Sequence, residues 1–120
     1  MSISNLAPGN ILLTQGTTAL AQRVANGVLK NWPVILASSD PIPDVLLRSG
    51  NVKRIPSANH ITFIHELLKL ALDQNMHYVL TLDPLEQEQL QNAKPLFNEY
   101  DIELLEVMTN IDGEYELVRL

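Results

Sequence analysis

Residues 78–86 read YVLTLDPLE, and this stretch joins a buried strand to the start of a helix. The apolar run at 78–82 is typical of a strand that lies inside a sheet. Asp83 has the side chain of an N-cap, Pro84 fits the first helical position, and Glu86 stands where a capping box places its reciprocal carboxylate. The stretch therefore predicts a strand followed at once by a helix, the unit from which parallel sheets are built.

The same alternation of strand and helix continues on both sides of this stretch. Further strands are expected at 10–15, 34–37, 52–55, 102–107 and 115–119, and further helices after Thr17 or Thr18, at 44–48 and at 61–75. The strand at 52–55 is charged and ends at Pro56, which favours a place near a sheet edge. The order predicts an α/β fold: one three-layer, Rossmann-like domain over residues 1–120, with a mainly parallel sheet and a short C-terminal hairpin strand.

Two helices have apolar side chains at helical spacing, and these are expected to face the sheet. In the helix at 61–75 they are Ile64, Leu67, Leu68, Ala71 and Leu72. In the helix that starts at Pro84 they are Leu85, Leu90, Ala93, Phe97 and Tyr100. Pro95 removes a backbone hydrogen bond inside this second helix, so a kink or a restart is expected near Lys94.

Composition excludes several classes of protein. The chain has 120 residues, of which 46% are hydrophobic and 18% are charged, which is typical of one folded domain. Its net charge of −6 argues against nucleic-acid binding, because phosphate contacts need a basic face. It has no cysteine, which excludes disulfides and thiolate chemistry. It also has neither an apolar run of membrane-spanning length nor a basic, apolar leader, so we expect a soluble cytoplasmic protein without a membrane partner.

The charge is unevenly distributed along the chain. Residues 1–60 contain five basic and two acidic side chains, whereas residues 61–120 contain three basic and twelve acidic ones. One interpretation is that the later helices have solvated acidic faces. The other is a dipolar molecule that attracts anions to its first half or assembles with copies of itself.

Candidate ligand-binding residues follow from the expected topology. In open parallel sheets, ligands bind outside the carboxyl ends of the strands where the strand order reverses. In this chain those ends carry Gly16, Thr17, Thr18, Ser38, Ser39, Asp40 and Asp83. Backbone N–H groups at the glycine turn suit an anion, and the acidic residue after the second strand stands near the spacing of a ribose-binding carboxylate. The second and third glycines of a dinucleotide motif are missing, so plain turn and capping roles remain the alternative interpretation.

The sequence predicts no catalytic residue, no metal site and no cofactor. It contains no H-E-x-x-H, no G-x-S-x-G and no G-x-x-x-x-G-K-[ST] pattern. Glu86 and Glu88 fit helix-cap and surface positions better than an acid–base pair.

With its elements in this order, the chain resembles the N-terminal, preATP-grasp domain of ATP-grasp ligases, and among them proteins similar to the carbamoyl-phosphate synthase large subunit. The likeness is carried by residues 10–18, 34–43, 53–57 and 63–104, and it extends over about residues 10–107. In such ligases a larger ATP-grasp region supplies the lysines that bind ATP phosphates and the acidic residues that bind magnesium. Because the matched stretches contain none of those positions, the resemblance implies a non-catalytic domain.

Three functions are consistent with this reading. The first is a protein-interaction or self-assembly module, most simply a homodimer, since the surface that the ligases cover with their catalytic domain needs a partner. The second is a sensor domain for a small molecule or nucleotide at the carboxyl ends of the strands. The third is an accessory subunit of a split ATP-grasp ligase that works with a separate protein partner.

Overall fold

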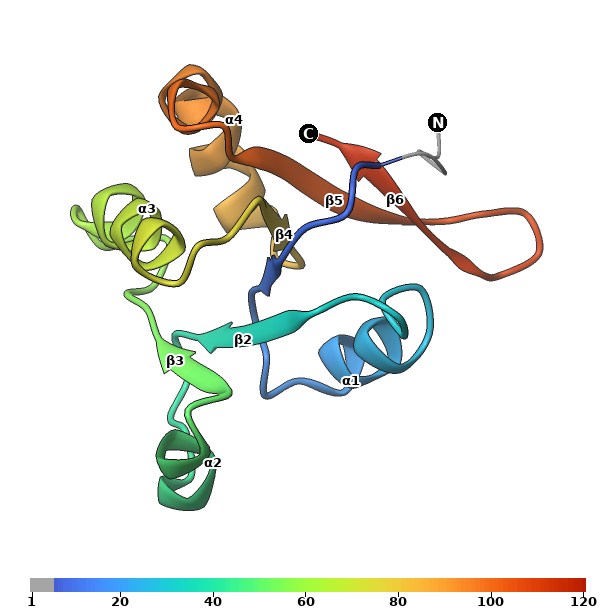
Figure 1. Cartoon of the computed structure of the whole chain (residues 1–120), viewed down its shortest axis with the longest axis horizontal. Coiled ribbons are helices and arrows are strands. Elements are labelled where there is room, and N and C mark those ends of the chain that lie inside the picture. Colours follow the sequence, from blue (N-terminus) through green and yellow to red (C-terminus); the bar gives the residue numbers. More distant parts are fainter. Residues whose placement is uncertain (1–5) are drawn as a thin grey trace.

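Short apolar strands separated by helix-length segments form a single six-stranded sheet (Figure 1). The structure is a computed structural model, and it describes residues 6–120; the first five residues of the predicted 1–120 domain lie outside the described part. The elements are β1 (Ile11–Leu13), α1 (Ala19–Asn26), β2 (Val34–Ser38), α2 (Asp44–Ser49), β3 (Val52–Arg54), α3 (Phe63–Asp73), β4 (Tyr78–Thr81), α4 (Pro84–Glu99), β5 (Glu103–Thr109) and β6 (Tyr115–Arg119).

The sheet has the strand order β3-β2-β1-β4-β5-β6. β1 pairs in parallel with β2 on one side and with β4 on the other, with Leu12 opposite Ile35 and Val79. The first three strands therefore extend toward one edge, and the chain then returns to build the other half, which places the switch point between β1 and β4. The predicted mainly parallel sheet is confirmed, as are the edge position of β3 and the antiparallel hairpin of β5 with β6.

Helices cover both faces of the sheet, which confirms the three-layer prediction (Figure 1). On one face, Leu12, Val79 and Leu104 pack with buried side chains of α3 and α4. On the other face, Ile11 and Leu80 pack with buried side chains of α1. Adjacent residues of one strand thus point to opposite faces, and this is why the central strands read as continuous apolar runs.

Two of the predicted helix faces are wrong in part. Leu85 and Tyr100 are about half exposed, and Leu72 is exposed as well. Leu90 and Phe97 are fully buried and fix the rotation of α4. Successive residues of a helix are separated by 100° around its axis. Leu85 is therefore turned away from the buried side chain of Glu86 and faces solvent.

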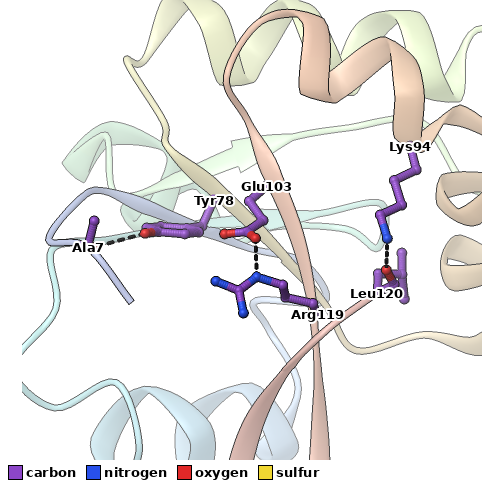
Figure 2. Close-up of polar contacts among 6 residues, drawn as sticks. All are labelled: Ala7, Tyr78, Lys94, Glu103, Arg119 and Leu120. Carbon is purple, nitrogen blue, oxygen red and sulfur yellow. Dashed lines mark hydrogen bonds and ion pairs between the residues drawn. The ribbon is translucent and has the colours of Figure 1, made fainter. Parts of the chain in front are cut away.

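Pro95 lies inside α4, which continues from Pro84 to Glu99 without the predicted restart. The proline ring is on an exposed part of the helix, where the freed backbone groups have access to water. One residue earlier, Lys94 Nζ donates to the carbonyl oxygen of Leu120 at 2.5 Å and ties the last turns of α4 to the end of β6 (Figure 2).

Polar contacts also hold the amino ends of β4 and β5 (Figure 2). The Tyr78 hydroxyl donates to the carbonyl of Ala7 at 2.7 Å, and Arg119 on β6 forms an ion pair with Glu103 on β5. Burial, together with the negative charge of Glu103, raises the pKa of the Tyr78 hydroxyl above its ordinary value. The Trp32 ring packs edge-on against the Tyr78 ring at 5.7 Å between centroids and closes this end of the core.

Gly16 lies where the turn after β1 crosses β2. Its N–H donates to the carbonyl of Ala37 at 2.8 Å. A Cβ atom at this position would stand 2.6 Å from the Cβ of Leu36, closer than real carbon atoms approach. Glycine is therefore required here by packing between two strands.

We expect Gly16→Ala to lower the free energy of unfolding by about 1–3 kcal/mol, the range for overpacking a tight core position. Urea denaturation followed by circular dichroism measures this. Gln22→Ala, at an exposed position of α1, is the control and should change stability by less than about 0.5 kcal/mol. Equal stabilities of the two variants would contradict the packing role of Gly16.

Candidate functional site

The carboxyl ends of β1, β2 and β4 converge at the switch point of the sheet. The structure brings the predicted residues that follow β1 next to those at the end of β2, since Thr17 Oγ1 and Ser38 Oγ lie 3.3 Å apart. Ser39 and Asp40 follow at the end of β2, where the Asp40 side chain is exposed. Asp83 belongs to the start of α4, beyond β4 on the other side of β1.

Most of these predicted residues are engaged in local hydrogen bonds. Thr18 is the N-cap of α1: its hydroxyl accepts from the N–H of Ala21 at 3.1 Å and donates to the carbonyl of Gln15 at 2.7 Å. Ser38 Oγ accepts from the N–H of Asp40 at 3.1 Å. The N–H of Gly16 donates to the carbonyl of Ala37, so this donor is already engaged and the turn offers fewer free N–H groups to an anion.

A residue that sequence reasoning did not select lies at the centre of the switch point. Glu86 is only 1% exposed, although its side chain is a carboxyl group. Its Oε2 accepts from the Gln15 side-chain amide at 2.9 Å, and its Oε1 accepts from the Thr81 hydroxyl at 3.0 Å. The neighbouring Thr14 hydroxyl accepts from the N–H of Leu82 at 3.1 Å. One buried carboxyl group therefore connects β1, β4 and α4.

The start of α4 explains this placement. The N-cap prediction is confirmed, because Asp83 Oδ2 accepts from the N–H of Glu86 at 3.0 Å and Pro84 occupies the first turn. The reciprocal half of the capping box and the surface role of Glu86 are wrong, since this side chain points to Gln15 and Thr81 instead. Glu86 precedes Leu90 by four residues and so shares its buried face. This four-residue spacing was the feature of the sequence that could have identified Glu86 as a buried residue.

The environment of Glu86 disfavours its charged form. Burial raises the pKa of this carboxyl above its ordinary value, and the negative charge of Asp83 adds to the effect. The side chains of Thr14, Gln15 and Thr81 act in the opposite direction, because hydrogen-bond donors stabilise a carboxylate. Burial is the largest contribution, so Glu86 keeps its proton to a higher pH than an exposed glutamate.

The chemistry of this site is that of a single buried acid among hydroxyl and amide groups. Within residues 6–120, no group of three His, Asp or Glu side chains is arranged to hold a metal ion.

In the same part of the chain, no helix combines the length and apolar character needed to cross a membrane. The sequence matches no protein-family model and no curated protein.

Glu86→Gln tests the electrostatic cost of the buried carboxyl. A group whose pKa is raised by folding stabilises the fold below its unfolded pKa, and this contribution is lost as pH rises through the folded pKa. The wild type should therefore lose this contribution above about pH 4.5, while the uncharged variant has none to lose. We expect the stability of the variant relative to the wild type to increase from about pH 4 to about pH 7.

Thermal unfolding across this pH range provides the measurement. Glu88→Gln, which removes an exposed carboxylate from the same helix, is the matched control and should follow the wild-type profile. A constant difference between Glu86→Gln and wild type at every pH would show that Glu86 does not titrate differently in the folded chain.

Proposed function

We propose that the chain is a non-catalytic cytoplasmic interaction domain of the preATP-grasp type that forms a two-fold homodimer. The observation that carries this proposal is an apolar surface on α3 and α4. Leu72 is 41% exposed, Leu96 is 38% exposed and Tyr100 is 49% exposed. Large apolar side chains that gather on one surface favour burial by a partner.

Two of these three side chains line one hollow, and the third stands one helical turn away on α4. Leu72 and Tyr100 line the same hollow of about 240 Å³ between α3 and the end of α4. Leu96 precedes Tyr100 by four residues and so lies beside it. We refer to Leu72, Leu96 and Tyr100 as the α3–α4 surface.

The charges next to this surface favour a second copy of the chain as the partner. Lys69 and Asp73 also line the hollow and stand one helical turn apart on α3. A two-fold axis that passes between them brings Lys69 of each copy to Asp73 of the other. The same surface therefore supplies both members of each ion pair, as an isologous interface requires. These two residues and the α3–α4 surface together define the proposed interface.

Sedimentation velocity over a dilution series tests the dimer. We expect a concentration-dependent dimer in the wild type and a monomer in Tyr100→Glu, because the variant places a charge in the apolar contact. Ile111→Glu is the matched control: Ile111 is fully exposed at the β5–β6 turn, and its variant should dimerise like the wild type. A wild type that stays monomeric at high concentration contradicts the proposal.

A charge exchange tests the arrangement of the two copies. Lys69→Asp should raise the dimer dissociation constant by up to about tenfold, because it places like charges together twice in each dimer. Adding Asp73→Lys should restore the wild-type constant, because the pairs re-form with opposite polarity. If the double variant remains as weak as Lys69→Asp, the two-fold contact between these residues is wrong.

A small-molecule sensor is the second candidate, and the buried carboxyl at the switch point favours it. Perturbed acids gather where α/β domains bind ligands, and Glu86 lies between the ends of β1 and β4. A thermal-shift panel of nucleotides, amino acids and carboxylates at millimolar concentration tests this candidate. A ligand-dependent shift that Asp40→Ala abolishes supports it, and the absence of any shift in the wild type contradicts it.

A further inference from the structure

Glu86 contacts a turn whose backbone is unusual. Gln15, the residue after Thr14 in the turn that follows β1, has φ +53°, a left-handed conformation that few residues other than glycine adopt. Its carbonyl accepts from the N–H of Thr18 at 3.0 Å and from the Thr18 hydroxyl at 2.7 Å. Its side-chain amide donates to Glu86 Oε2 at 2.9 Å. The conformation is thus fixed at the backbone by Thr18 and at the side chain by Glu86.

Both carboxyl oxygens of Glu86 accept a hydrogen bond, and each donor comes from a different strand end. Gln15 follows β1, and Thr81 is the last residue of β4. A carboxylate serves two such donors at once. A protonated carboxyl carries a hydrogen on one oxygen, which makes that oxygen a weaker acceptor and favours reorientation of its donor.

We propose that Glu86 is a proton-sensitive switch whose ionised form holds Gln15, and with it residues 14–18, in the conformation described here. The hydroxyl of Thr81 can turn and accept the new proton on Oε1, because a hydroxyl is both a donor and an acceptor. Gln15 then keeps only a bond to a neutral carbonyl oxygen, which is about half as strong as a bond to a carboxylate. Protonation therefore weakens the side-chain contact that holds the left-handed turn.

The surroundings of Glu86 determine where this switch operates. Among the described residues that act on it, Asp83 is the charged one, and Thr14, Gln15 and Thr81 are the neutral ones. Because burial raises the pKa of Glu86, the switch responds to milder acid than an exposed glutamate would. The affected turn contains Gly16, Thr17 and Thr18, and Thr17 lies against Ser38 at the end of β2.

Protonation of Glu86 should have opposite effects on the stability of the whole fold and on the stability of the turn at Gln15. Acidification through the Glu86 titration relieves the cost of a buried charge and stabilises the whole fold. At the same time it loosens the turn at Gln15. An ordinary buried acid with a purely structural role would change global stability and leave this turn as it was.

NMR on the full chain tests the switch. The Glu86 side-chain carboxyl carbon reports its ionisation, and the side-chain amide signals of Gln15 should move with the same midpoint. At one fixed pH near 7, Glu86→Gln should increase amide exchange at Thr18 about fivefold, the factor expected for one lost neutral hydrogen bond. Exchange at Val79, in the centre of β4, should increase by a smaller factor than exchange at Thr18, because the predicted loosening is confined to the turn.

Two further variants test the switch if Glu86→Gln does not fold. Asp83→Asn keeps an N-cap side chain and removes the nearby negative charge, so both midpoints should move together to lower pH. Gln15→Ala removes a donor to the carboxylate, so the Glu86 midpoint should move to higher pH. The proposal is overturned if the Gln15 amide signals ignore the Glu86 titration, or if the two midpoints separate in Asp83→Asn.

Discussion

The carboxyl group of Glu86 joins the two halves of the sheet at the point where the strand order reverses. Around it, β1 contributes Gln15 through its following turn, β4 contributes Thr81, and α4 begins. A buried carboxylate is tolerated only when hydrogen bonds replace the water it has lost, so these groups depend on one another. Among the described residues, every buried side-chain nitrogen or oxygen has such a partner. The close contact of Gly16 with β2 completes the same junction from the other side of β1.

Much of the fold could be predicted because local chemistry and tertiary structure agree. The run at Ile11–Leu13 is apolar because both of its faces are covered, and the charges of β3 fit its edge position. Asp83 and Pro84 start α4 as their side chains require. The prediction of the inner face of α4 failed at Leu85. A hydrophobicity pattern assigns the buried position to this apolar residue and not to its acidic neighbour Glu86. The packing of Leu90 and Phe97 fixes the helix rotation and places Glu86 there instead.

The candidate site was predictable in position and only partly in composition. Topology alone places Thr17 and Ser38 together at the carboxyl ends of the strands. The left-handed backbone of Gln15 has no signature in the sequence, because glycine, the usual residue for this conformation, stands one position later. The packing role of Gly16 was not predicted either, since its missing side chain leaves room for Leu36.

The position of β1 has a consequence for how the chain can be divided. This strand of three residues obtains one neighbour from the first half of the sequence and the other, β4, from the second half. A fragment that contains only β1, β2 and β3 would leave the central strand open along one side, with Leu12 deprived of the α3 and α4 side chains that cover it. We therefore expect neither half of the polypeptide to fold alone, since a cut between β3 and α3 separates the edges of β1 and β4 that pair in the intact chain.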